Sequence, residues 1–217
     1  AAELAALITP TDRSLPPRRP APPAASPPTA PDRPIPPDDL FAVVAATWPP
    51  DGVLVHESPS NMAALRRHLR ISRPASYFAA ASGGLGFGLP AAVGIALAER
   101  DTGRNRPVIA IIGDGAFQYS VQALWTAVRH RLPVVYIVPV NHEYAILKSF
   151  ARLTATTGVP GLDLPGLDIP TIARGFGCRA EQVESADAVA EALRTALRGT
   201  EPVVLAVPIT AEAPPIL

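Results

Sequence analysis

Two polar side chains follow two apolar segments of the sequence at matching positions. Asp114 comes just after the apolar run 107–112, between two glycines, and Asn141 follows the apolar run 132–140. If both runs are neighbouring parallel strands, the two side chains emerge at the same edge of the sheet, where such folds bind ligands. A carboxylate, an amide oxygen and nearby backbone carbonyls suit a hard divalent cation such as Mg²⁺.

The two glycines beside Asp114 strengthen this interpretation. Gly113 and Gly115 have no side chain, so the backbone at these positions can approach a ligand closely. A helix that begins after them would present its N-terminus to an anion. Together these features favour a diphosphate that a metal ion bridges to the protein. The alternative from the residues alone is that Gly-Asp-Gly is only a turn.

A second cluster of glycines occupies the segment 82–90, which reads Ser-Gly-Gly-Leu-Gly-Phe-Gly-Leu-Pro. The third glycine of a dinucleotide-binding G-x-G-x-x-G motif is displaced here, and the chain contains no G-x-x-x-x-G-K-[ST] motif. Four glycines before a helix indicate close contact of the backbone with a ligand or another subunit. A tightly packed helix is the alternative.

Strands and helices are predicted to alternate along the chain. Apolar runs predict buried strands at 107–112, 132–140 and 202–207, and two further strands are predicted at 52–55 and 177–183. Helices are predicted at 38–47, 61–69, 88–99, 121–131, 144–150 and 168–175, followed by one that Ser185 caps. Asp38 or Asp39 is expected to cap the first helix. This order predicts an α/β fold, a mostly parallel sheet with helices on both faces.

Proline divides the chain into two parts. It makes up 27 of 217 residues, and 14 of the 27 lie among the first 50, whereas about 5% of residues are proline in an average protein. Residues 9–37 contain four Pro-Pro pairs, which predict an extended, semi-rigid connector. A ligand for a proline-binding module is the alternative for this segment. We expect residues 38–217 to form one domain.

The composition argues against several classes of function. The 19 basic and 19 acidic side chains give no net charge and a pI near 7.1, which argues against binding to nucleic acid or to anionic membranes. No apolar run is long enough for a membrane span. The single cysteine, Cys178, fits a reducing compartment. We therefore expect a cytoplasmic protein.

These motifs, in this order, resemble the thiamine diphosphate-dependent enzymes. Gly-Asp-Gly at 113–115 with Asn141 is similar to the diphosphate motif of that family. The benzoylformate decarboxylase branch is resembled most, through HES at 56–58, SYFAAASGGLGFGLPAAVGIALAE at 76–99, VIAIIGDG at 108–115, ALWTA at 123–127 and VPGLDLPGLD at 159–168. The resemblance spans residues 41–210, the diphosphate-binding part of a family chain, and implies the thiamine diphosphate-binding fold.

The resemblance implies roles for individual residues. Asp114 and Asn141 would bind Mg²⁺ through side-chain oxygens and Glu143 through its backbone carbonyl. Gly115 and Ala116 would offer backbone N–H groups to the diphosphate. The other residues implied to contact thiamine diphosphate are Pro59, Ser60, Gly83, Gly84, Leu85, Tyr144, Ala145 and Ile146.

Further implied roles concern the organic part of the cofactor and the substrate. The Gly83 carbonyl would accept a hydrogen bond from the aminopyrimidine, and Leu85 would lie under the cofactor and hold it bent. The residues implied to line the side that faces the substrate are Ala79, Ile146, Leu147 and Phe150.

Several positions depart from the family pattern. Ala116 replaces a frequent serine, and Pro59 stands where the similar branch has a threonine. His142 and Glu143 replace a smaller, more neutral pair. Ala79 stands where the similar branch has an aromatic residue, which puts an aromatic substrate in doubt.

The resemblance also implies what the chain lacks. In this family the glutamate that activates the cofactor belongs to a separate pyrimidine-binding domain, so no catalytic residue is expected here. Residues 1–8 resemble the end of the family's middle domain, and 9–37 resemble its linker. We therefore expect a C-terminal fragment that is inactive alone, with a natural split subunit as the alternative. The expected partner is a pyrimidine-binding domain of the same or another subunit, in a homodimer or homotetramer.

The implied function is non-oxidative decarboxylation of a small-molecule 2-oxo acid to an aldehyde and CO₂, with thiamine diphosphate and Mg²⁺ as cofactors. Within the family, the alternative is a carboligase similar to acetolactate synthase. Outside enzyme function, the alternative is a non-catalytic interaction module that retains the fold.

Overall fold

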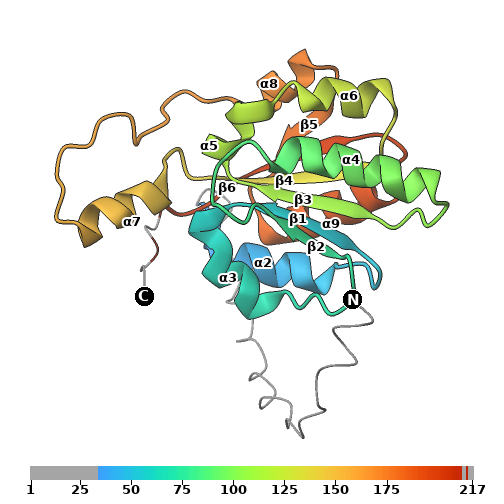
Figure 1. Ribbon diagram of the computed structural model, residues 1–217, viewed down its shortest axis with the longest axis horizontal. Helices are drawn as coiled ribbons and strands as arrows, with labels where there is room; N and C mark the ends of the chain where they lie inside the picture. Colours follow the sequence, from blue (N-terminus) through green and yellow to red (C-terminus); the bar gives the residue numbers. More distant parts are fainter. Residues whose placement is uncertain (1–33, 212–213, 215–217) are drawn as a thin grey trace, which may run out of the picture.

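Buried apolar runs form the strands at the centre of the protein. The computed structural model describes residues 34–211 and 214. Its sheet has six strands, all parallel, in the spatial order β2-β1-β3-β4-β6-β5 (Figure 1). The strands are β1 (Val53–Glu57), β2 (Tyr77–Ala79), β3 (Val108–Ile112), β4 (Val134–Val140), β5 (Arg179–Gln182) and β6 (Val203–Pro208). Every residue of β1, β3 and β4 is buried, as expected of parallel strands covered on both faces.

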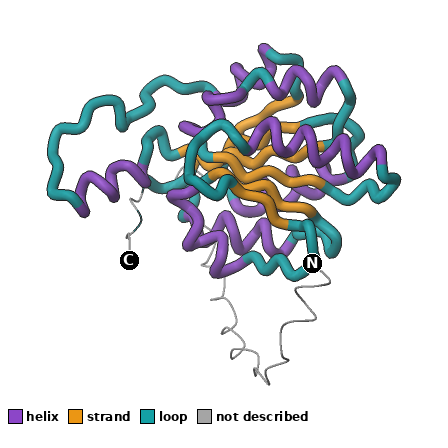
Figure 2. The backbone as a smooth tube through the Cα atoms, viewed as in Figure 1, coloured by secondary structure: helices purple, strands orange, loops and turns teal. Residues whose placement is uncertain are grey.

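Alternate residues of the strands pack against two separate layers of helices. Val108 and Ala110 of β3 face one layer, and Ile109 and Ile111 face the other. The first layer consists of α4 (Gly88–Asp101), α5 (Asp114–Phe117), α6 (Ala123–Arg129) and α8 (Ile169–Gly175). The second consists of α2 (Pro37–Ala46), α3 (Met62–His68) and α9 (Ala186–Leu197). The sheet therefore separates two apolar cores, with helices on both of its faces (Figure 2).

One helix stands outside these layers. α7 (Ala145–Leu153) follows β4 and projects beyond the carboxyl end of the sheet, and the segment 154–168 returns from it to α8 (Figure 1). Two 3₁₀ turns, η1 (Pro59–Asn61) and η2 (Gln118–Ser120), lie at the starts of α3 and α6. Because β3 and β4 are parallel neighbours, the residues that follow them meet at one edge of the sheet.

The structure confirms the predicted fold class and tests two predicted helix caps. Ser185 caps α9 as predicted, because its hydroxyl accepts the backbone N–H of Ala188 over 3.2 Å. The predicted cap by Asp38 or Asp39 is wrong. α2 begins at Pro37, so both aspartates lie inside its first turn, and no side chain caps it.

Asp38 instead connects α2 to α3. Its carboxylate accepts hydrogen bonds from the Arg67 guanidinium over 2.6 and 2.8 Å, and its Oδ1 lies 2.9 Å from Nε2 of His68. The hydrogen bond from Arg67 holds the pKa of Asp38 below its usual range. Asp38 therefore binds side chains of the neighbouring helix α3 and does not cap the N-terminus of α2.

Two short elements were not predicted. β2 has three residues at the edge of the sheet, and α5 has four residues directly after β3. Neither is long enough to show a periodic apolar pattern.

The folded body includes residues before position 38. Ile35 is fully buried, its N–H donates to the Pro208 carbonyl over 2.9 Å, and its own carbonyl accepts the N–H of Thr210 over 3.1 Å. The predicted middle-domain remnant, 1–8, and the connector up to residue 33 lie outside the described residues.

Among the residues that the structure describes, no helix combines the length and the apolar character needed to cross a lipid bilayer.

Candidate functional site

The Asp114 carboxylate lies between the ends of β3 and β4 and is bound by backbone groups. Its Oδ1 accepts the N–H of Gly115 over 2.8 Å, and its Oδ2 accepts those of Asn141 (3.1 Å) and His142 (2.7 Å). His142 adopts the left-handed conformation, with a φ of 56°, in this turn. The structure therefore brings Asp114 and Asn141 together across 27 positions of sequence.

Burial dominates the electrostatics of Asp114. The residue is 3% exposed, and its removal from water raises the pKa of the carboxyl group. The hydrogen bonds from His142, Gly115 and Asn141 act in the opposite direction but only in part. A cation beside Asp114 would favour its ionised form and offset the cost of burial.

Asn141 and Glu143 form the turn after β4. The Asn141 Oδ1 accepts the backbone N–H of Glu143 over 3.2 Å. The Glu143 carboxylate forms an ion pair with Lys148 of α7, which also binds Asp163 over 2.6 Å. Asp163 and then Glu143 raise the pKa of Lys148, so the ammonium group stays charged. The Glu143 carboxylate is therefore already engaged by a cationic side chain.

Most of the residues expected to bind the cofactor line one hollow beside Asp114. Ten of them line this Asp114 hollow, namely Pro59, Ser60, Leu85, Asp114, Gly115, Ala116, Asn141, Glu143, Tyr144 and Ile146. The rest of its wall comes from Ser58, Asn61, Gly113 and Pro139. The three expected metal ligands thus share one hollow with the expected diphosphate contacts.

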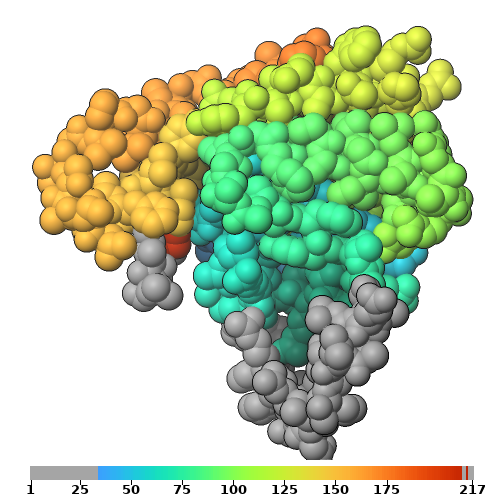
Figure 3. All heavy atoms as spheres, in the orientation of Figure 1, coloured from blue at the N-terminus to red at the C-terminus, as the bar shows by residue number. Residues whose placement is uncertain are grey.

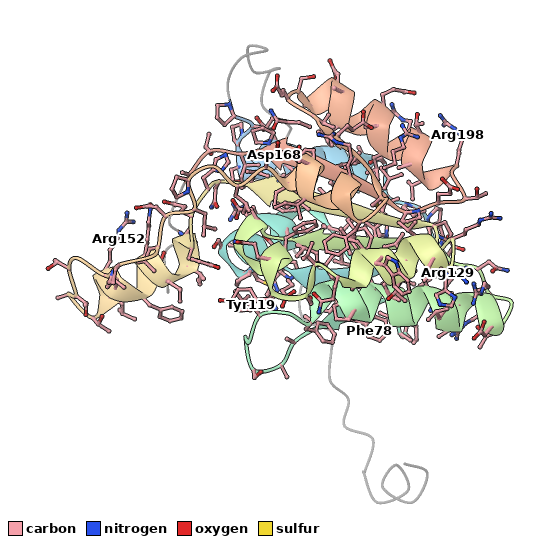
Figure 4. All side chains as sticks on the ribbon, turned by 90° about the horizontal axis from the view of Figure 1, so that it is seen from above. Phe78, Tyr119, Arg129, Arg152, Asp168 and Arg198 are labelled. Carbon is pink, nitrogen blue, oxygen red and sulfur yellow. The ribbon has the colours of Figure 1, made fainter. Side chains whose placement is uncertain are left out.

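The Tyr144 ring packs directly on Gly115. A Cβ atom on Gly115 would lie 2.8 Å from Cδ1 and 3.1 Å from Cζ of this ring, so a side chain does not fit there while the ring keeps its position. Burial, with a hydrogen bond to Tyr119, raises the pKa of Tyr144 to about 12. Tyr119 itself is 56% exposed and lies beside Gly86 of the glycine-rich loop (Figure 4).

The turn before α3 connects this hollow to α7. The Ser60 hydroxyl accepts the backbone N–H of Ile146 over 3.0 Å. The Ser58 hydroxyl accepts a hydrogen bond from the Asn61 amide over 2.9 Å, which fixes the turn itself. Ala145, also expected to contact the cofactor, is fully buried at the start of α7 and is not part of the lining.

A second hollow, the Gly83 hollow, adjoins the first. Its lining consists of His56, Glu57, Ser58, Pro59, Met62, Ala79, Ala80, Gly83, Gly84 and Leu85. Ser58, Pro59 and Leu85 belong to both linings, so the two hollows meet at these residues. Burial lowers the pKa of His56 to about 4, so its ring is neutral at pH 7.

The expected substrate-facing residues are not gathered in one place. Ala79 lines the Gly83 hollow and Ile146 lines the Asp114 hollow. Leu147 and Phe150 line neither and are 45% and 47% exposed on α7. Figure 3 shows α7 and the segment after it as a lobe set off from the body, and Figure 4 shows Arg152 on the same helix, away from the sheet. Leu147 and Phe150 therefore need a further surface opposite them to form a pocket.

Eight lining residues were not among the expected site residues, namely His56, Glu57, Ser58, Asn61, Met62, Ala80, Gly113 and Pro139. A usable sequence signal exists only for Glu57. α4 begins after Gly-Phe, and no side chain at its own start caps it. Its first N–H groups therefore need an acceptor from elsewhere in the chain.

The described residues contain no group of three or more His, Cys, Asp and Glu side chains that could hold a metal ion. A metal ion in the Asp114 hollow would therefore need mixed oxygen ligands: one carboxylate, one amide and backbone carbonyls. Such a set suits Mg²⁺ rather than a thiolate- or imidazole-binding metal.

Comparison with known proteins places this arrangement in a family. The thiamine pyrophosphate enzyme family, C-terminal TPP-binding domain, matches residues 60–207. Benzoylformate decarboxylase of Pseudomonas aeruginosa is 43% identical over 171 residues, which are 79% of this chain and 32% of that protein. Acetolactate synthase of Bacillus subtilis is 34% identical over 125 residues, 58% of this chain and 21% of that protein.

A solved structure shows the same arrangement of elements. The crystal structure of benzoylformate decarboxylase from Polynucleobacter necessarius matches with a TM-score of 0.83 and 45% identity, over 88% of this chain and 36% of that chain. The chain thus spans about a third of the length of these two decarboxylases. Since both sequence and structure match, the chain belongs to the thiamine pyrophosphate enzyme family, as its C-terminal TPP-binding domain.

Proposed function

We propose that the protein to which this chain belongs is a thiamine diphosphate-dependent 2-oxo acid decarboxylase, and that this chain holds the cofactor. The observation that carries the proposal is the junction of the two hollows. The Asp114 hollow offers metal ligands and backbone N–H groups, and the Gly83 hollow offers exposed backbone and apolar side chains. An elongated ligand with a diphosphate at one end and an organic ring at the other matches this pair.

The metal and diphosphate would be held by residues that follow β3 and β4. Asp114 and Asn141 would bind Mg²⁺ through side-chain oxygens, and Glu143 through its carbonyl. Gly115 and Ala116 would donate N–H groups to the diphosphate, and the Gly115 N–H would then leave Asp114 Oδ1, which accepts it over 2.8 Å in this structure. This assignment is supported by the buried Asp114 carboxylate, whose raised pKa a divalent cation would lower, and by the single hollow that all five residues line.

The organic part of the cofactor would lie between the two hollows. Leu85 belongs to both linings and would support the cofactor from below, while the Gly83 carbonyl would accept a hydrogen bond from the aminopyrimidine. Bound thiamine diphosphate supplies an electron sink for the pair left behind when a 2-oxo acid loses CO₂. This chain would bind and orient the cofactor and would keep water from one side of it.

Catalysis by the whole protein would require a partner. We propose a pyrimidine-binding domain, from the same or another subunit of a homodimer or homotetramer, that faces Ala79, Leu147 and Phe150. The exposure of Leu147 and Phe150 supports this, because an apolar pocket at these side chains needs a second surface opposite them. On this proposal the chain alone is inactive, and the single free, buried Cys178 fits a cytoplasmic location.

Replacing the central carboxylate tests the proposal. In the full-length protein, Asp114→Ala should abolish Mg²⁺-dependent binding of thiamine diphosphate, because it removes the only carboxylate of the proposed metal set. Isothermal titration calorimetry with Mg²⁺ measures this directly. Unchanged affinity in the variant would refute the site.

A matched control removes another aspartate at the carboxyl side of the sheet. Asp168 caps α8 by accepting the N–H of Thr171 over 2.9 Å and lines neither hollow. Asp168→Ala should therefore leave cofactor affinity intact. If the unaltered full-length protein binds no thiamine diphosphate with Mg²⁺, a non-catalytic module that retains the fold replaces the proposal.

The second candidate within the family is a carboligase, favoured by the match to acetolactate synthase and by the small side chain of Ala79. Product analysis separates the two candidates. A decarboxylase releases an aldehyde from a 2-oxo acid, tested first with benzoylformate. A carboligase joins two substrate units instead.

A further inference from the structure

The Glu57 carboxylate is buried against the backbone of the glycine-rich loop, residues 82–90. Glu57 ends β1 and is 5% exposed. Its Oε1 accepts the backbone N–H groups of Gly86 and Phe87 over 2.6 and 3.0 Å, and its Oε2 accepts that of Gly88 over 2.8 Å. Glu57 therefore stands 29 to 31 positions before the groups that it binds.

These hydrogen bonds occupy the start of α4. The helix has 14 residues, and Phe87 at its N-cap position contributes no side-chain acceptor. The Glu57 carboxylate supplies that acceptor and places a negative charge at the positive end of the helix dipole. These three N–H groups are consequently not free to bind a phosphate.

The same residue also contacts the Gly-Asp-Gly segment. The backbone carbonyl of Glu57 accepts the N–H of Gly113 over 3.0 Å. Gly88 has no room for a side chain, since a Cβ atom there would lie 2.8 Å from Oε2 of Glu57 and would also meet Ile112. Glu57 thus connects the two glycine segments that line the two hollows.

The part of the loop that faces the Gly83 hollow has little other support. Ser82, Gly83 and Gly84 are exposed, and a Cβ atom on Gly83 would meet no atom within 4 Å. Gly83 and Gly86 both have positive φ, at 71° and 105°. The bonds to Glu57 directly follow this exposed stretch, so they determine where its backbone lies.

We propose that Glu57 is a positioning residue that holds Gly83 to Leu85 in place for the pyrimidine end of the cofactor; this rests on the proposed function. Glu57 acts through the loop and does not touch the diphosphate. Its loss should therefore weaken binding of the whole cofactor while leaving binding of a bare diphosphate unchanged.

Glu57→Gln in the full-length protein separates these two effects. The amide nitrogen cannot accept the N–H that Oε2 accepts now, so one buried donor loses its partner. We expect the Kd for thiamine diphosphate with Mg²⁺ to rise about tenfold or more, and the Kd for inorganic pyrophosphate with Mg²⁺ to stay within about twofold. Both affinities are measured by calorimetry.

Glu99→Gln is the matched control. Glu99 is another buried carboxylate of α4, at its opposite end, where Arg106 donates to it over 2.6 and 3.0 Å. This variant should destabilise the protein without changing either affinity. In the cofactor-free proteins, amide hydrogen exchange at residues 86–88 should be faster in Glu57→Gln than in Glu99→Gln.

Three outcomes would overturn the inference. The first is an unchanged thiamine diphosphate affinity in Glu57→Gln, and the second is an equal loss for both ligands, which indicates a general defect. The third is unchanged hydrogen exchange at the loop. If the unaltered protein binds pyrophosphate but not thiamine diphosphate, the proposed function itself fails, while hydrogen exchange still decides whether Glu57 holds the loop.

Discussion

The two glycine-rich segments of this protein, 82–90 and 113–115, are both held by a buried carboxylate, but that carboxylate lies in a different place relative to each segment. In each, one buried carboxylate accepts three backbone N–H groups. Asp114 lies inside its own segment and binds the N–H groups of Gly115, Asn141 and His142. Glu57 lies outside the segment 86–88, whose three N–H groups it binds. The Asp114 carboxylate is part of a turn, whereas the Glu57 carboxylate binds the N-terminus of α4.

This difference decides what each segment can bind. The Asp114 carboxylate lines a hollow, so its oxygens can meet a cation there. The N–H groups at the start of α4 already have an anion, so they are closed to a phosphate. Glycine content before a helix therefore does not identify a phosphate site unless the fate of the helix N–H groups is known.

The largest expected effect on stability comes from a side chain at Gly88. A methyl group there would meet Ile112, which is fully buried, and would lie 2.8 Å from Oε2 of Glu57. Gly88→Ala should lower the free energy of unfolding by about 1–3 kcal/mol, as overpacking of a core does. Urea denaturation followed by circular dichroism measures it.

Gly94→Ala is the matched control in the same helix. A Cβ atom on Gly94 would meet nothing within 4 Å. Alanine should therefore raise the free energy of unfolding by about 0.5–1 kcal/mol, the usual gain over glycine inside a helix. Equal effects of the two substitutions would show that the contact between Gly88 and Glu57 is not tight.

A smaller effect is expected at Gly115, the corresponding glycine of the other segment. Its added methyl group would meet the Tyr144 ring, which is only half-buried and can move aside. Gly115→Ala should therefore cost no more than about 1 kcal/mol, the low end for overpacking. The displaced ring would enter the Asp114 hollow, which Tyr144 lines. The free energy of cofactor binding should therefore weaken by more than the free energy of unfolding falls.

A double-mutant cycle tests the role of the ring. In a Tyr144→Ala background, Gly115→Ala should have almost no further effect on the free energy of unfolding, because the contact is already gone. The same cost in both backgrounds would mean that Gly115 avoids something other than Tyr144.

The sequence predicts the Asp114 segment far better than the Glu57 segment. The apolar runs before Asp114 and Asn141 are continuous, and continuous runs predict neighbouring parallel strands. Strand order then brings the two side chains together without any knowledge of packing. The uncapped start of α4 indicates only that an acceptor is needed. That Glu57 supplies it depends on how the start of α4 approaches the end of β1, which no local pattern encodes.

Other differences have equally specific causes. β2 was missed because its three residues lie at the sheet edge and are not fully buried. The cap at Asp38 was predicted from its position, but Arg67 and His68 of α3 attract that carboxylate instead. Leu147 and Phe150 share an exposed face of α7, and a single chain cannot show what covers that face.

The smallest effect expected is a pH dependence at Glu99, a buried carboxylate that binds arginine rather than backbone. Arg106 holds the pKa of Glu99 below its ordinary value of 4.5, mainly by hydrogen bonding. A carboxyl group with a lowered pKa stabilises the folded protein above its unfolded pKa, and this stabilisation is lost as pH falls through the folded value. The destabilisation caused by Glu99→Gln should therefore be complete at pH 7 and should shrink below about pH 4.5.

Asp114 gives the opposite case. Its pKa is raised, so ionising it works against folding, and the contribution of Asp114 to the free energy of unfolding should improve on acidification. Unfolding free energies of Glu99→Gln and Asp114→Ala between pH 3 and pH 7 would show whether arginine and backbone N–H groups hold a buried carboxylate differently, and parallel pH profiles would show that they do not.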